Sequence, residues 1–173
     1  MAGSKLTSFA MRLIAAAVVI GINSTDANCT WKAVNKPPSE WMSSAAATVG
    51  ENAVAFAGGT SINPITGRFG DDRTQVTTYN PATDVWHTLP NMSYARSAPA
   101  AAALNGRLFV FGGVQRKPNA SHSDPDPTIK MAVVESIAIS DSGRTTETHW
   151  KREIDLPGPR ESPSAVAVGN RGI

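Results

Sequence analysis

The chain repeats one arrangement of small, turn-forming and apolar residues. In two copies, a turn leads into a short apolar run that ends in paired glycines: Ala53–Ala57 before Gly58 and Gly59, and Leu108–Phe111 before Gly112 and Gly113. Apolar runs of four or five residues bounded by turn residues predict buried β-strands. Asn105-Gly106, just before the second run, is a strong signal for a two-residue hairpin.

A stretch of small residues precedes each turn, and its structure can be interpreted in two ways. The stretches are Ser43–Val49, Ser97–Leu104 and Ser162–Val168. Alanine is the best helix former, so a pair of helices is the alternative. Pro99 and Pro163 interrupt two of the copies, and apolar or β-rich runs follow. These features favour small-residue strands, which tolerate crowding where the inner strands of a ring converge.

Tryptophan marks the period of the repeat. Trp31, Trp86 and Trp150 begin three segments that align without gaps before each small-residue stretch. The repeat of roughly 50 residues, with four short strands, is the size of one β-propeller blade. We therefore predict an all-β fold of four-stranded antiparallel blades, about three in number, with repeat units at 31-86, 87-150 and 151-173. The tryptophans are expected to cover the faces between neighbouring blades.

These residues resemble the kelch-repeat family. Its blades carry a double glycine after the second strand, matched by Gly58-Gly59 and Gly112-Gly113, and a Tyr–Trp pair, matched by Tyr79 and Trp86. Arg96 and Arg160 match the basic residue that opens the first strand of the family's blades. The chain departs from the pattern where Trp41 replaces this arginine, where Ile139 is expected at the tyrosine position, and where several residues are inserted before Trp150.

Three blades cannot close a ring, because closed propellers need about four to eight. The end blades would then expose strand edges and apolar faces. Two explanations are open: the chain is a fragment of a longer kelch protein, or it completes a ring by oligomerising. In either case missing blades or an oligomer partner must close the ring.

The N-terminal segment predicts secretion. Lys5 and Arg12 precede a short apolar run, Leu13–Ile22, and a small-residue exit follows. This pattern is typical of a signal peptide, here 1-27, which leaves residues 28-173 as the partial propeller. The alternative is a buried or fraying N-terminal helix. Asn91 and Asn119 lie in glycosylation sequons, so a secreted glycoprotein is expected, without a membrane span after signal removal.

Composition and charge limit the classes of partner and cofactor that the chain is expected to bind. The 16 Lys and Arg residues and 14 Asp and Glu residues are scattered, with a net charge of +2. A nucleic-acid surface would need a concentrated basic stripe, so none is predicted. The single cysteine excludes an internal disulfide and a multi-cysteine zinc site. We predict no cofactor and no metal, since the alternating His122, Asp124 and Asp126 are interpreted as loop polarity.

Candidate ligand-binding residues follow the double glycines. Two long loops, 60–73 and 114–130, would emerge on one face, with Arg96 and Arg160 near the channel mouth. Guanidinium groups there could bind a carboxylate, a sulfate or a sugar acid. The alternative is that each arginine satisfies loop carbonyls between blades. Asp71, Asp72 and Arg73 could accept sugar hydroxyls or a cation.

The preferred function is a secreted, non-catalytic binding module that engages protein or carbohydrate through the loop face. Ser162 and Ser164, beside Arg160, show no paired His and Asp, so nucleophilic catalysis lacks support. The resemblance leaves one alternative: the propeller domain of a secreted enzyme, such as a galactose-oxidase-like oxidase or a sugar epimerase. Its catalytic residues would then lie largely outside this chain.

Overall fold

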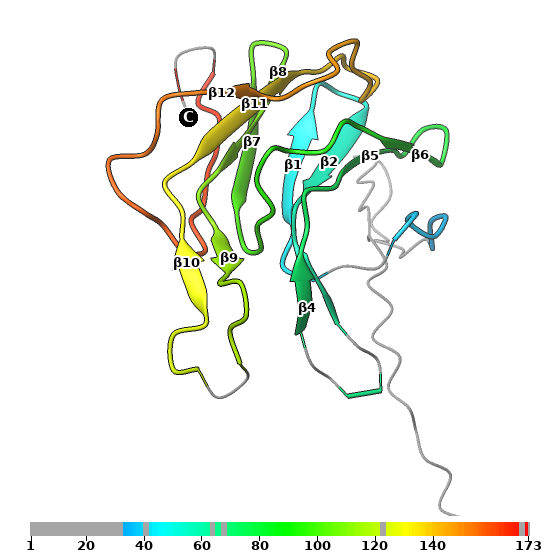
Figure 1. Ribbon diagram of the computed structural model, residues 1–173. Coiled ribbons are helices and arrows are strands. Elements are labelled where there is room, and N and C mark those ends of the chain that lie inside the picture. The colour runs from blue at the N-terminus through cyan, green and yellow to red at the C-terminus, as the bar shows by residue number, and fades with distance from the viewer. Residues whose placement is uncertain are drawn as a thin grey trace, which may run out of the picture.

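The computed structural model describes residues 33–39, 42–62, 65–66, 69–121, 124–169 and 172. Within this part of the chain every regular element is a β-strand, and the strands form two four-stranded sheets that lie side by side (Figure 1). The all-β prediction is therefore confirmed. The signal-peptide prediction, residues 1-27, lies outside the described residues.

The first sheet has the order β1-β2-β5-β6, and all neighbouring strands are antiparallel. Its strands are β1 (Ala45–Val49), β2 (Ala53–Ala57), β5 (Val76–Asn80) and β6 (Val85–Thr88). The second sheet, in the order β7-β8-β11-β12, repeats this topology. Its strands are β7 (Ala100–Leu104), β8 (Arg107–Phe111), β11 (Val134–Ala138) and β12 (Lys151–Arg152).

The first two small-residue stretches are strands β1 and β7, which excludes the helical alternative for them. The predicted Asn105-Gly106 hairpin joins β7 to β8, and both turn residues have positive φ, 50° and 70°. The third stretch forms no regular strand in its described residues, and an isolated bridge joins Val168 to Gly172. The part of the chain that the structure describes thus contains two complete blades.

The tryptophans mark outer strands and do not begin blades. Trp86 lies within β6, and Trp150 directly precedes β12. Of the boundaries drawn from Trp to Trp, at 31-86, 87-150 and 151-173, the first therefore cuts through β6 and the second separates β12 from the rest of its sheet. The two sheets themselves extend over residues 45–88 and 100–152.

The hydrophobic core lies between the two sheets. Small alanines on β1 and β2 face larger side chains of the second sheet, such as Leu108, Val110 and Ile137, all fully buried. The small residues let inner strands β1 and β7 contact each other, as the convergence of blades requires. Trp150 is buried in this core, and its indole Nε1 donates to the carbonyl of Pro90 at 2.8 Å. Trp150 thus covers the face of the preceding blade.

Tyr79 and Trp86 pack on the opposite face of the first sheet. They are direct cross-strand partners, with ring centroids 4.8 Å apart, and Phe56 lies 5.5 Å from Trp86. The Tyr79 hydroxyl donates to Asp84 at 2.7 Å, which closes the turn between β5 and β6. Burial, together with Asp84, raises the pKa of Tyr79 to about 12.

The counterpart of Tyr79 in the second sheet is Ile137. Tyr79 is paired with Val54 on β2, and Ile137 is paired with Leu108 on β8, at the same distance from the double glycine. The expectation that Ile139 holds this position was therefore wrong. The extra residues before Trp150 follow the end of β11 and leave the register of β11 unchanged.

Two further hairpins extend from one end of the sheets (Figure 1). They pair β3 (Thr60–Ile62) with β4 (Phe69–Asp72), and β9 (Val114–Arg116) with β10 (Thr128–Lys130). We call these hairpins the arms and this end of the molecule the arm end. Each arm begins directly after a double glycine, as the long loops of the sequence predicted.

The double glycines connect each sheet to the start of the following repeat. Gly58, Gly59, Gly112 and Gly113 all have positive φ, between 54° and 102°. The second glycine of each pair donates its N–H to the carbonyl of an arginine: Gly59 to Arg96 at 2.8 Å and Gly113 to Arg160 at 2.9 Å. A Cβ at Gly58 would lie 2.5 Å from the Arg96 carbonyl oxygen, so no side chain fits there.

We expect Gly58→Ala to lower the free energy of unfolding by about 2–4 kcal/mol, because the left-handed conformation and the clash with the Arg96 carbonyl add up. The measurement is urea denaturation. The matched control is Gly169→Ala, since Gly169 has a φ of 54° but nothing within 4 Å of its added Cβ. Equal losses in the two variants would refute the role of close approach.

Candidate functional site

The two arms are joined to each other at the arm end. Strands β4 and β9 lie in contact, and the backbone N–H of Arg116 donates to the Asp72 carboxylate at 2.5 Å. Thr60 adds hydrogen bonds from its hydroxyl to carbonyls of β4, with 3.1 Å to Gly70. Hairpins from two different repeats therefore form one connected surface.

Asp71, Asp72 and Arg73 line one small hollow of about 290 Å³, together with Ser61, Thr74 and Gln75. The structure thus brings together three of the five residues that the sequence predicted as ligand-binding. Asp71 is exposed, whereas Asp72 already accepts the bond from Arg116. Arg73 donates to Gln75 at 2.8 Å, and its buried Nε has no hydrogen-bond partner among the described residues.

Apolar side chains also reach the surface of the arms. Phe69 on β4 is 57% exposed and Ile129 on β10 is 49% exposed. Sequence analysis did not single them out, because it treated residues 60–73 and 114–130 as loops and considered only charged residues in them as candidates. Their exposure follows from the arms, which extend beyond the sheets and, among the described residues, have no layer packed over them.

Arg96 lies in the interior, next to the base of the first arm. Its side chain is fully buried, and Nη2 forms an ion pair of 2.5 Å with the equally buried Glu135. Nη1 donates to the carbonyls of Gly112 and Val133 at 3.2 and 3.0 Å. Burial lowers the pKa of Arg96, and the negative charge of Glu135 opposes that shift. Arg96 thus follows the alternative given from the sequence, in which the arginine hydrogen-bonds to carbonyls between blades. Its buried side chain is not accessible to a ligand in this structure.

Glu135 is the partner that sequence analysis missed. Its other carboxylate oxygen accepts the backbone N–H of Ser93 at 2.9 Å. A comparison of the two repeats could have revealed this partner. In the first repeat, Thr77 stands at the position of Glu135 and Trp41 stands at the position of Arg96. The acidic residue and the arginine are therefore both absent from the same repeat. Trp41 itself lies outside the described residues, and the buried Thr77 hydroxyl has no hydrogen-bond partner among the described ones.

Arg160 repeats the backbone role of Arg96 but not its side-chain role. Its carbonyl accepts the N–H of Gly113, and its N–H donates to Met131. The side chain is exposed, and Nη1 donates to the adjacent Pro159 carbonyl at 3.1 Å. Of the two predicted arginines, only Arg160 presents its guanidinium to solvent, and it does so apart from the hollow at Asp71 to Arg73.

The remaining predicted positions lie as follows. Asn91 and Asn119 are both exposed, so a glycan on either would project into solvent.

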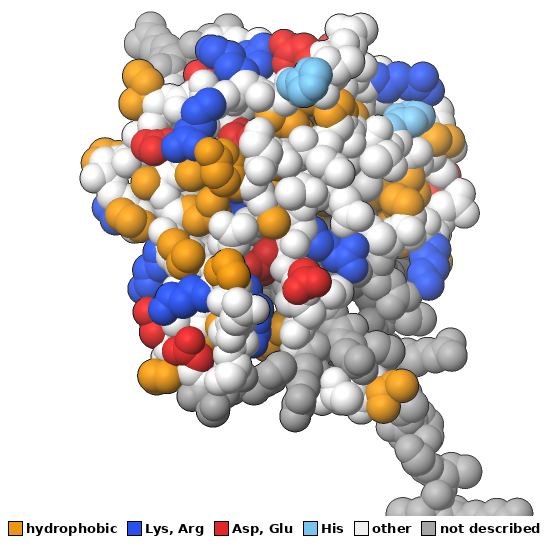
Figure 2. Space-filling model, in the orientation of Figure 1, with side chains coloured by type: hydrophobic (Ala, Val, Ile, Leu, Met, Phe, Trp, Pro, Cys, Tyr) orange, Lys and Arg blue, Asp and Glu red, His pale blue; other side chains and the backbone are white. Residues whose placement is uncertain are grey.

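Among the described residues no three His, Cys, Asp or Glu side chains are arranged to hold a metal ion, and His122 lies outside that set. No helix in the described part is long and apolar enough to cross a membrane. Basic and acidic side chains are interspersed over the visible face (Figure 2).

Comparisons with known proteins agree with this geometry. No protein-family model matches the chain. It is 42% identical over 104 residues to Kelch-like protein 21 of Rattus norvegicus and 29% identical to Kelch-like protein 21 of Mus musculus, in each case over 60% of this chain and 16% of the relative. The solved structure of YjhT superposes with a TM-score of 0.56 at 16% identity, over 78% of this chain and 43% of that one.

These comparisons support the resemblance of the chain to the kelch-repeat propeller family. The double glycines, the cross-strand Tyr79–Trp86 pair and the two four-stranded sheets are its kelch features. The chain matches about one sixth of the length of the Kelch-like protein 21 relatives. The structural match to YjhT speaks for the fold alone.

We expect Glu135→Gln to destabilise the second kelch blade by about 3–5 kcal/mol, because it leaves the Arg96 guanidinium buried without its counter-charge. The matched control is Glu147→Gln in the part-exposed Arg107–Glu147 pair, which should cost far less because solvent screens it. The measurement is chemical denaturation.

A double variant, Arg96→Met with Glu135→Leu, separates charge from packing. It should lose less stability than the sum of the two single losses, since neither charge is left unpaired. Additive losses would show that the two side chains act independently, against the geometry described above.

Proposed function

We propose that this chain supplies kelch blades to a binding module and that its arm end engages a protein ligand. The observation that carries the proposal is the exposure of Phe69 and Ile129 on two arms that are linked through Asp72 and Arg116. Binding surfaces on proteins combine apolar anchors with a polar rim.

The charges around these anchors supply such a rim. Asp71, two residues after Phe69, is exposed, and Lys130, next to Ile129, forms a part-exposed ion pair with Glu161 at 3.2 Å. Exposed ion pairs contribute little to stability, so these charges remain available to a partner. The hollow at Asp71–Gln75 is small and polar and suits one polar side chain of a partner better than a buried small molecule.

The test is a binding screen of the full chain against an array of extracellular proteins, followed by affinity measurements on each positive. Phe69→Ser with Ile129→Ser should weaken binding by about tenfold or more, since buried apolar anchors dominate interfaces. The matched control is Val85→Ser on β6, which is 42% exposed but lies outside the arms. Ligands that bind the double variant as tightly as the unaltered chain would refute the proposal.

Carbohydrate is the second candidate ligand, favoured by the aspartates and Arg73 that line the hollow. A glycan array distinguishes the two. Binding that is lost in Asp71→Ala and Arg73→Ala, and kept in the Phe69 and Ile129 variant, would support a sugar. That result would count against a protein ligand at this surface.

We also propose that further blades cover the two outward sheet faces, either from a longer product or from another copy of the chain. The support is the state of the second sheet and of the segment after it. Phe109 and Phe111 on β8 stack at 6.2 Å and remain half-buried, and Val166 and Val168, which follow the sheet and lie in no regular strand, are more than half exposed. Sedimentation of the purified chain separates the two sources. A stable monomer with native spectra would exclude oligomeric closure.

The N-terminal segment supports entry into the secretory pathway. The basic residues, the short apolar run and the exposed sequons at Asn91 and Asn119 support this part of the proposal. Expressed in cultured eukaryotic cells, the chain should reach the medium without residues 1–27 and shift in mass on deglycosylation. Asn91→Gln with Asn119→Gln should remove that shift if these sequons carry the glycans. Retention of the chain in the cytosol with its N-terminus intact would refute the proposal.

A further inference from the structure

The residues inserted before Trp150 line a cleft. The connection that they form lies at the end of the molecule opposite the arms (Figure 1). In the first blade β5 and β6 are joined by the short turn 81–84, whereas residues 139–150 join β11 to β12. The longer connection reaches back over the first blade, where the Thr78 hydroxyl donates to the carbonyl of Gly143 at 2.7 Å. This bond is buried and joins the two blades.

Gly143 allows the close approach. Its φ is 77°, and an added Cβ would lie 2.9 Å from both the Ala53 Cβ and the Thr78 hydroxyl oxygen. Two hydrogen bonds between Ser140 and Arg144 hold the adjacent turn. The backbone N–H of Ser140 donates to the Arg144 carbonyl at 2.8 Å, and the backbone N–H of Arg144 donates to the Ser140 hydroxyl oxygen. The backbone that carries the Arg144 side chain is therefore fixed before any ligand arrives.

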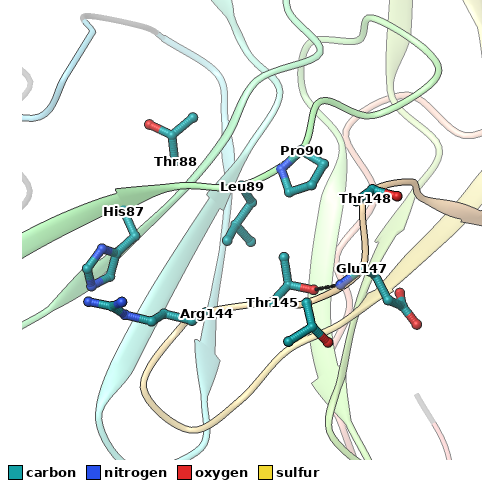
Figure 3. A pocket seen from close by; sticks show the side chains of 9 residues that line it. His87, Thr88, Leu89, Pro90, Arg144, Thr145, Glu147 and Thr148 are labelled. Carbon is teal, nitrogen blue, oxygen red and sulfur yellow. Dashed lines mark hydrogen bonds between the residues drawn. The ribbon is translucent and has the colours of Figure 1, made fainter.

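The cleft measures about 470 Å³ and has two walls. Residues 87–90, which are the end of β6 and the two residues after it, form one wall, and residues 144–148 of the connection form the other (Figure 3). Leu89 and Pro90 provide an apolar lining, and threonine side chains from both walls add hydroxyl groups. This volume is within the usual range for small-molecule sites.

The charge available in the cleft is positive. Glu147 is the acidic residue that lines it, and both of its carboxylate oxygens accept bonds from Arg107, at 3.0 and 3.2 Å. These bonds and one from the Ala138 N–H lower the pKa of Glu147, and the charge of its carboxylate is balanced by Arg107. By contrast, the guanidinium of Arg144 and the ring of His87 have no side-chain partner among the described residues. They lie next to each other at one end of the cleft (Figure 3).

We propose that this cleft binds a small hydroxylated ligand carrying a phosphate or sulfate group. The anionic group is held by Arg144 and His87, and the uncharged part lies along Leu89, Pro90 and the threonines. Guanidinium and imidazole N–H groups form charge-assisted bonds to oxyanions, and a fixed wall lowers the cost of ordering. The site is independent of the arm end, so the two proposals stand or fall separately.

The test titrates the full chain with sulfate, phosphate, glucose 6-phosphate and glucose 6-sulfate at constant ionic strength, with glucose as the uncharged control. Amide NMR shifts locate the binding, and calorimetry gives the affinity. We expect shifts confined to residues 87–90 and 139–148, tighter binding of the sugar esters than of the free ions, and no binding of glucose. The preference between the phosphate and sulfate esters identifies the anion.

Arg144→Met should weaken sugar-ester binding by roughly 10-fold to 100-fold, and His87→Gln should weaken it less. Arg144→Lys should restore part of the affinity, because charge returns without the forked geometry. The matched control is Lys117→Met, which removes one positive charge at the arm end. Absent binding, shifts outside the cleft, or equal losses in Arg144→Met and Lys117→Met would overturn the proposal.

Discussion

The close approach of two backbones at each double glycine is the constraint on which the rest of the structure depends. The N–H of the second glycine meets the carbonyl of the arginine that opens the next repeat, at 2.8 Å for Gly59 and 2.9 Å for Gly113. Because no Cβ fits at Gly58 or Gly112, each sheet is fixed through main-chain atoms to the segment that starts the following repeat. The same glycines redirect the chain into the arms, so blade packing and the arm surface have one origin.

A buried ion pair reinforces this junction in one of the two blades. The carbonyl of Arg96 accepts the N–H of Gly59, while its side chain donates to the carbonyl of Gly112 after β8 and pairs with Glu135 on β11. The pair therefore ties an interblade connection to the middle of the following sheet. In the first blade a threonine takes the place of the acid, and packing of Phe56, Tyr79 and Trp86 dominates there instead.

The two ends of the kelch sheets differ in chemistry. At the arm end, hairpins from successive repeats expose apolar and charged side chains over a wide surface, which suits a large partner. At the opposite end, a single longer connection folds back on the preceding blade and encloses a smaller, positively charged cleft. Similar blades thus offer different binding surfaces, because loops vary while the sheets hold them in place.

The sequence by itself determined the small-residue and apolar strands β1, β2, β7 and β8, the Asn105-Gly106 turn and the glycine junctions, because each depends on local conformational preferences. It predicted loops where the structure has the arm strands. It also predicted that Asp71, Asp72 and Arg73 lie together, since they are contiguous. Only the tertiary structure decided that Glu135 neutralises Arg96, that Ile137 is the counterpart of Tyr79, and that Arg144 faces His87. These relations join residues about 40 or more positions apart, or depend on strand register, and distant pairing is set by packing that local patterns do not encode.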